Sequence, residues 1–134
     1  MLKIGVDIHG VATDARAFFA ELTRTLVAAG HEVHILTGPP LKVARAEIEQ
    51  LGLSYTHVFS ITDYHESVGT AITYDDRGHP FMDEYLWDRT KGDYCLREGI
   101  QLHIDDSDTY NLFFKTPYAR FYSKDKRKHY VKSS

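Results

Sequence analysis

Four short segments of this chain carry residue types that could bind a metal ion and a phosphate group. Three of them end short apolar runs, and the fourth opens a stretch with a helical pattern. The segments are Asp7, Thr37-Gly38, Lys91 and Asp105-Asp106. If the apolar runs form one parallel sheet, all four segments meet at its carboxyl edge, where open α/β sheets bind ligands.

The chemistry of these side chains is complementary. Carboxylates from two strands offer the hard oxygen ligands that suit Mg²⁺. Thr37 offers a hydroxyl, and the backbone at Gly38 can approach an anion closely and donate amide hydrogens. Lys91 supplies a positive charge for a phosphate group, although Lys42, just after the Thr-Gly segment, is an alternative. Phosphoryl transfer needs mainly positioning and charge neutralisation, and Asp7 can serve as its nucleophile.

The elements that must position these residues follow from a repeated pattern of helix, glycine and strand. Glycine just past a helix is a typical cap, and the series indicates crossovers between parallel strands. The pattern ends at Gly30, Gly52 and Gly99. Counting a first strand that ends at Asp7, the expected strands are 3–7, 32–37, 55–60, 100–105 and 118–122. We therefore predict a three-layer α/β/α sandwich with a mainly parallel, Rossmann-like sheet of about five strands.

Three helices are expected between these strands. Residues 13–29 place apolar side chains at three- and four-residue steps, and residues 40–51 do the same after a proline that suits a helix start. These apolar faces are Phe18, Phe19, Leu22 and Leu26, and then Leu41, Ala44, Ile48 and Leu51. The third helix is expected to open at Thr90, because Thr90 and Asp93 have the spacing of a capping box. This places Lys91 in a first helical turn.

We predict a single domain over residues 1–123, with a small insert at about 63–88. The insert is rich in aromatic residues and reads as a hairpin or long loop over the carboxyl edge. Its side chains could contact a substrate or pack the insert onto the core: Tyr64, His65, Tyr74, His79, Phe81, Tyr85 and Trp87. Residues 124–134 form a basic tail, for which a solvated terminus is expected rather than a contact with nucleic acid.

Composition narrows the function classes. The chain has 134 residues, of which 43% are hydrophobic and 26% are charged, with a net charge of -3. Neither nucleic acid nor a membrane is therefore the expected partner, and no apolar run is long enough to span a bilayer. A single cysteine, Cys95, cannot form an internal disulfide, which fits a cytoplasmic protein, and we expect it in the core. The chain has eight histidines, but they lack helical metal-site spacing, so no histidine-based zinc site is expected.

Taken together, the four segments resemble the motifs of the haloacid dehalogenase-like (HAD) superfamily of phosphohydrolases. Val6-Asp7-Ile8-His9-Gly10-Val11 resembles the first motif, Asp-x-Asp-Gly-Thr/Val, and Ile35-Leu36-Thr37-Gly38 resembles the second. Lys91 fits the third motif, and Ile104-Asp105-Asp106-Ser107 resembles the fourth. Their order and strand-end placement agree with the family across nearly the whole chain.

The resemblance implies roles for individual residues. Asp7 would be the nucleophile and a Mg²⁺ ligand, and the backbone carbonyl of His9 would be a second ligand. Asp105, Asp106 or both would complete the metal shell. Thr37, Gly38 and Lys91 would bind the phosphate. The short spacing from the first to the second motif implies a small-cap member, whose cap would be the insert after Gly38.

His9 departs from the family pattern, which usually has a second aspartate here as general acid and base. Histidine can also perform acid–base chemistry. The implied function is a cytoplasmic, Mg²⁺-dependent phosphatase of a small, possibly nucleotide-like phosphomonoester, through an aspartyl-phosphate on Asp7. The alternatives are a slow enzyme, or a catalytically impaired protein that binds a phosphorylated ligand or a protein partner. The sequence leaves the oligomeric state open.

Overall fold

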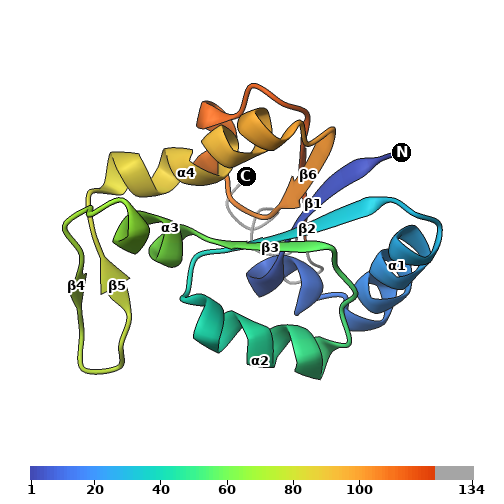
Figure 1. Cartoon of the computed structure of the whole chain (residues 1–134), viewed down its shortest axis with the longest axis horizontal. Helices are drawn as coiled ribbons and strands as arrows, with labels where there is room; N and C mark the ends of the chain where they lie inside the picture. The colour runs from blue at the N-terminus through green and yellow to red at the C-terminus, as the bar shows by residue number, and fades with distance from the viewer. Residues whose placement is uncertain (123–134) are drawn as a thin grey trace, which may run out of the picture.

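The computed structural model describes residues 1–122 of the chain (Figure 1). Five strands form one parallel sheet in the order β3-β2-β1-β6-β7. Their bounds are β1 (Lys3–Asp7), β2 (Glu32–Thr37), β3 (His57–Ser60), β6 (Leu102–Asp105) and β7 (Tyr118–Arg120). The predicted parallel sheet of about five strands is therefore confirmed, and each strand lies within its expected range.

Helices cover both faces of the sheet, as expected for a Rossmann-like α/β fold (Figure 1). One face carries α1 (Arg16–Ala28) and α2 (Leu41–Leu51), and the other carries α4 (Glu84–Glu98). Two hydrophobic clusters hold these layers together. The larger cluster contains Val6, Val33, Ile35, Phe19, Ala44 and Ile48, and the smaller contains Leu36, Tyr94, Cys95 and Ile100.

Several expectations for the helices are confirmed. Helix α2 begins directly after Pro40 and buries Ala44 and Ile48. Gly52 and Gly99 adopt left-handed conformations, with φ of 66° and 71°, where α2 and α4 end. Cys95 is fully buried in the cluster under α4. The predicted apolar face of the first helix is wrong at one position, because Phe18 is 60% exposed while Phe19 is 1% exposed.

The predicted start of the third helix is wrong. Helix α4 begins at Glu84, where the Asp83 carboxylate accepts a hydrogen bond of 2.9 Å from the Leu86 amide. Thr90 is therefore inside the helix, and its hydroxyl donates to the Leu86 carbonyl one turn earlier. A threonine that bonds back in this way is compatible with a helix interior. Lys91 accordingly lies in the middle of α4.

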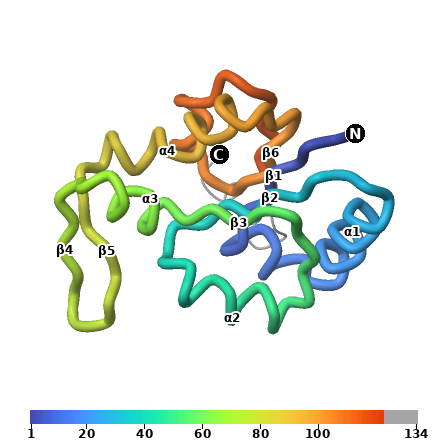
Figure 2. The backbone as a smooth tube through the Cα atoms, in the orientation of Figure 1, coloured from blue at the N-terminus to red at the C-terminus, as the bar shows by residue number. Residues whose placement is uncertain are grey.

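The insert contains more regular structure than a loop. It contains α3 (Ile61–Ser67) and a hairpin formed by β4 (Thr73–Tyr74) and β5 (Pro80–Phe81), and then continues into α4. The backbone trace shows that the chain passes directly from β3 into α3 and that the hairpin projects beyond the sheet (Figure 2). The predicted hairpin is thus present, but helices flank it on both sides.

Two further segments shape the loops around the sheet. They are the π-helical turn η1 (Ile8–Ala12) and the 3₁₀ helix η2 (Tyr110–Phe113). Within residues 1–122 no helix has the length and apolar character needed to cross a membrane. The predicted basic tail, residues 124–134, lies outside the described residues.

Candidate functional site

Three of the predicted segments meet at the carboxyl edge of the sheet. Asp7 ends β1 and Asp105 ends β6, and these strands are neighbours in parallel register. Lys91 reaches down from α4, so that its Nζ lies 2.9 Å from Asp7 Oδ1 and 2.8 Å from Asp105 Oδ2. One ligand oxygen from each of Asp7, Asp105 and Asp106 lies within 4.8 Å of the others. The structure therefore brings the lysine and the carboxylates together.

Burial controls the electrostatics of this cluster. Burial raises the pKa of Asp7 to about 7, and the negative charges of Asp105 and Asp106 add to that effect against the attraction of Lys91. Burial alone would also raise the pKa of Asp105, but Lys91 and His103 outweigh it and hold that pKa below its usual range. The pKa of Lys91 is raised because the two carboxylates outweigh the effect of burial. Lys91 is therefore a permanent cation between two competing carboxylates.

Hydrogen bonds fix the orientation of Asp105. Its Oδ2 accepts from Lys91 and from Nε2 of the fully buried His103, which lies 2.9 Å away. Its Oδ1 accepts from the Ser107 amide at 3.1 Å. Asp106 is less buried and lines the adjacent cavity. His103 gave no catalytic signal in the sequence, where it was one of several histidines in expected strands.

A cavity of about 530 Å³ opens directly above the carboxylates. Its walls come from the ends of β1 and β6, the loop after β2, and one side of α4. The lining residues are Asp7, His9, Gly38, Pro39, Glu84, Trp87, Asp88, Lys91, Asp105, Asp106, Ser107, Thr109 and Tyr110. This is enough space for a small ligand beside the charged cluster.

Of the two predicted phosphate-binding residues in the second motif, only Gly38 lines the cavity. A Cβ at Gly38 would lie 2.7 Å from Cζ2 of Trp87, so glycine allows that ring to lie against the loop. Thr37 is fully buried, and its hydroxyl has no hydrogen-bond partner among residues 1–122. Side chains alternate between the two faces of a sheet along a strand. Thr37 therefore lies on the same face as Val33 and Ile35, and Leu36 lies on the opposite face, which α4 covers.

His9 lies at the cavity but is turned toward a residue that sequence reasoning missed. Its Nε2 is 2.5 Å from Oε2 of Glu47 on α2, and its side chain is about half exposed. The backbone of His9 is extended within η1, and Gly10 follows with a φ of 80°. Nothing in the sequence spacing linked positions 9 and 47, because the contact depends on how α2 packs beside η1.

The alternative phosphate lysine, Lys42, is exposed on α2 and does not line the cavity. Two aromatic residues do. Trp87 Nε1 donates a hydrogen bond of 2.9 Å to Tyr110 Oη, and Lys91 Nζ lies 5.2 Å from the centre of the Tyr110 ring. The sequence placed Trp87 in the insert but gave no signal for Tyr110.

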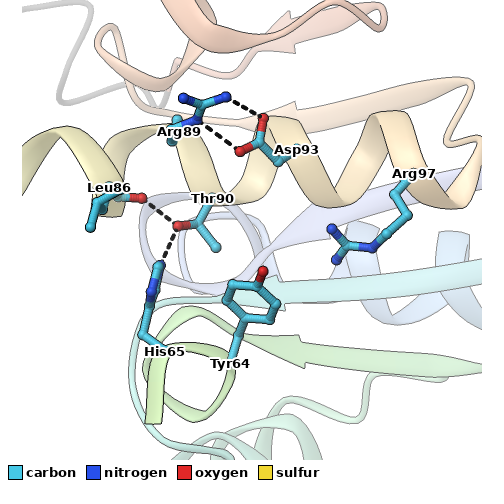
Figure 3. Close-up of a pocket in the computed structure, with 7 residues that line it drawn as sticks. All are labelled: Tyr64, His65, Leu86, Arg89, Thr90, Asp93 and Arg97. Atoms are coloured by element: carbon cyan, nitrogen blue, oxygen red, sulfur yellow. Dashed lines mark hydrogen bonds and ion pairs between the residues drawn. The ribbon is translucent and has the colours of Figure 1, made fainter. Parts of the chain in front are cut away.

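A second, smaller cavity of about 220 Å³ lies between α3 and α4 (Figure 3). Arg89, one of its charged residues, pairs with Asp93 at 2.8 Å. Thr90 donates its hydroxyl proton to Leu86, so His65 must donate Nε2–H to Thr90 across 2.7 Å. Burial lowers the pKa of His65, which fits this neutral state. Of the contacts drawn, the one between His65 and Thr90 joins α3 to α4, and the others lie within α4. Neither His65 nor the exposed His79 lines the larger cavity.

No protein-family model matches this chain, and no curated protein is a significant match to its sequence. Among solved structures, the chain is similar to one described as the crystal structure of Thermoplasma acidophilum 0175. The two share 12% sequence identity with a TM-score of 0.45, over 99% of this chain and 98% of that chain.

Proposed function

We propose that this protein is a Mg²⁺-dependent phosphohydrolase of the HAD-like class, acting on a small phosphomonoester through an aspartyl-phosphate on Asp7. The observation that carries the proposal is the contact of Lys91 with both Asp7 and Asp105 beneath an open cavity. A buried carboxylate beside a fixed cation and further carboxylates supplies both a nucleophile and the charges that phosphoryl transfer requires.

The donor set fits Mg²⁺. Asp7 and Asp105 share one lysine, so this pair carries excess negative charge when both are ionised, and an oxygen of Asp106 lies close to them. That excess contributes to the raised pKa of Asp7, and a divalent cation would offset it. Asp7, the acidic doublet and, by analogy with the family, the backbone carbonyl of His9 would hold the ion. When bound, Mg²⁺ supplies positive charge against the phosphoryl oxygens.

The chain's own residues then carry two steps. In the first, a carboxylate oxygen of Asp7 attacks phosphorus, and the bond from phosphorus to the leaving alcohol breaks while His9 gives that alcohol its proton. In the second, water attacks the aspartyl-phosphate, His9 takes a proton from the water, and the Asp7 carboxylate is restored as phosphate leaves. Lys91 and the backbone at Gly38 bind the phosphoryl oxygens throughout.

Trp87 and Tyr110 support a substrate with a flat ring, such as a nucleotide. Both line the cavity on the side of α4 and η2, within the same space as the carboxylates. Aromatic side chains of this kind stack on bases and bury apolar surface. The hairpin insert would then be the small cap of the family pattern.

Turnover of p-nitrophenyl phosphate tests the proposal. We expect Mg²⁺-dependent hydrolysis that falls by at least about a thousandfold in Asp7→Asn, because the nucleophile is removed while the shape is kept. Asp14→Asn, an exposed carboxylate in the turn before α1, is the matched control and should retain activity. Equal activity in wild type and Asp7→Asn would refute the mechanism.

The rival function is a non-catalytic binder of phosphorylated ligands. Its supporting observation is that His9, at the position of the family's general acid, is paired with Glu47. A folded wild type that binds a phosphomonoester but shows no turnover between about pH 5 and 8 with excess Mg²⁺ would favour this function. Gain of turnover in His9→Asp would then identify the histidine as the residue that disables catalysis.

A further inference from the structure

A second group of side chains that could bind a metal lies in the first half of β2 and at the start of β3, away from the carboxyl edge that holds the carboxylate cluster. Glu32 and His34 point the same way from the start of β2, and His57 opens the neighbouring edge strand β3. His34 and His57 are directly paired in the parallel register. One ligand atom from each of the three residues lies within 4.8 Å of the others.

The two distances from Glu32 to the histidine nitrogens lie on either side of the separation expected for two ligand atoms on one transition-metal ion. Glu32 Oε1 lies 2.8 Å from His34 Nε2 and 3.9 Å from His57 Nδ1. Two ligand atoms on a tetrahedral Zn²⁺, each at about 2.0–2.1 Å, are separated by about 3.3 Å. On binding, the distance from Glu32 to His34 would therefore lengthen and the distance from Glu32 to His57 would shorten, each by about half an ångström. Rotation of the side chains is sufficient for changes of this size.

Tyr94 can stabilise either neutral tautomer of His34, including the one that leaves Nε2 free to bind a metal. Its hydroxyl lies 2.7 Å from Nδ1 of His34, on the opposite side of the ring from Glu32. A tyrosine hydroxyl can either donate or accept. It can therefore donate to Nδ1 while Nε2–H bonds to Glu32, or accept from Nδ1–H while Nε2 binds a metal. A hydrogen bond to the remote nitrogen is the usual way in which a metal-binding histidine is oriented.

We propose that Glu32, His34 and His57 form a binding site for a divalent first-row transition-metal ion, with Zn²⁺ as the representative. Two imidazoles and one carboxylate suit Zn²⁺ far better than Mg²⁺, which prefers oxygen ligands. Three protein ligands leave a fourth position for water. The site is independent of the proposed phosphohydrolase function, because it shares no residue with the carboxylate cluster.

The surroundings of the site set the conditions for binding. The ring of His57 stacks on that of His34 at 4.1 Å, and its Nδ1 lies 2.9 Å from Thr56 Oγ1. Binding must turn this half-exposed ring out of both contacts. Lys3 is paired with Glu32 across β1 and β2 and competes for its charge. Burial lowers the pKa of His34, so the ring is neutral near pH 7. Its single proton moves from Nε2 to Nδ1 when Nε2 binds the ion, so binding requires a change of tautomer and releases no proton from this ring.

The register of β2 and β3 explains why the spacing of histidines in the sequence did not predict this metal site. A helical zinc site repeats its ligands at four-residue intervals, whereas this one uses positions two apart on one strand and a partner on the next strand. The separation of 23 positions between His34 and His57 acquires meaning only once β2 and β3 are paired.

Zinc titration of the whole chain by calorimetry, with excess Mg²⁺ present to fill the carboxylate cluster, tests the proposal. We expect one tight site in the wild type, weakened at least tenfold in His57→Ala and in Glu32→Gln. The matched control is His79→Ala, which removes an exposed histidine that pairs with Asp75 at 3.0 Å and is not one of the three proposed ligands. It should bind within twofold of the wild type.

A second variant and a direct measurement complete the test. Tyr94→Phe keeps the ring that packs against Phe59 but removes the hydroxyl, and should weaken binding by about 10–100-fold. Imidazole nitrogen NMR of the wild type should show zinc shifting His34 Nε2 and His57 Nδ1. Wild-type affinity in His57→Ala, or zinc shifts confined to other histidines, would overturn the proposal.

Discussion

Replacing Lys91 by methionine tests how the carboxylate cluster is held together. Lys91 is 2% exposed and lies within 2.9 Å of one oxygen of Asp7 and of Asp105, both of which are also buried. An exposed pair would contribute at most about 1 kcal/mol, whereas removing one partner of a buried pair typically destabilises by about 3–5 kcal/mol. Because Asp7, with a pKa of about 7, can take up a proton and relieve part of the repulsion, we expect the lower end, about 3 kcal/mol.

Urea unfolding and thermal melting at neutral pH measure this loss. About 3 kcal/mol corresponds to a fall in Tm of roughly 10 °C for a domain of this size. Lys42→Met is the matched control, because Lys42 is exposed on α2 and should change stability by no more than about 0.5 kcal/mol. If Lys91→Met were no less stable than this control, the cluster would not depend on the lysine charge.

The pH dependence of the same variant has a definite sign. In the folded wild type, the pKa of Asp105 is lower than in the unfolded chain, so ionised Asp105 stabilises the fold. This stability is fully present above the pKa of the unfolded state and is lost as pH falls through the pKa of the folded state. Without Lys91 the pKa of Asp105 rises, because only His103 then opposes the effect of burial, and the pKa of Asp7 rises with it. Protons then neutralise both groups in the folded variant, so the stability gap to the wild type should narrow between about pH 7 and pH 4.

Two further substitutions test contacts that only the structure shows. Glu47→Gln removes the carboxylate that orients His9, so kcat for p-nitrophenyl phosphate should fall about tenfold with little change in KM. The control is Glu49→Gln, which changes an exposed residue of the same helix. An equal effect of both substitutions would show that Glu47 is not part of the site. Gly92→Ala should lower the free energy of unfolding, measured in urea, by about 1–3 kcal/mol, because the new Cβ would lie 2.6 Å from the Phe113 carbonyl oxygen. This loss is expected even though alanine favours a helix over glycine by about 1 kcal/mol. A more stable Gly92→Ala protein would mean that η2 does not pack this closely on α4.

Local patterns in the sequence were sufficient for the architecture. Helical segments that end at Gly52 and Gly99, each followed by an apolar run, predicted parallel strands, because glycine caps and residue periodicity are properties of a short stretch of chain. The same logic placed Asp7 and Asp105 at strand ends, and parallel strands bring such ends to one edge. The carboxylate cluster could therefore be predicted without knowing any contact.

Other features of the candidate site depended on packing. The helix carrying Lys91 begins at Glu84 and not at Thr90, yet the lysine still reaches the carboxylates because α4 lies over β1 and β6. The direction of Thr37 follows from strand alternation together with the face that each helix covers. Whether a residue of the second motif faces the cavity could not be decided from its type alone.

The sequence by itself determined the order of the five parallel strands and of the three long helices between them, and the presence of acidic groups at the carboxyl edge, because periodicity and caps are encoded locally. Only the tertiary structure decided that His9 meets Glu47 and that His34 stacks on His57. Those pairs join segments more than twenty residues apart, and their contact depends on strand register and helix packing, which arise from the summed burial of the whole core.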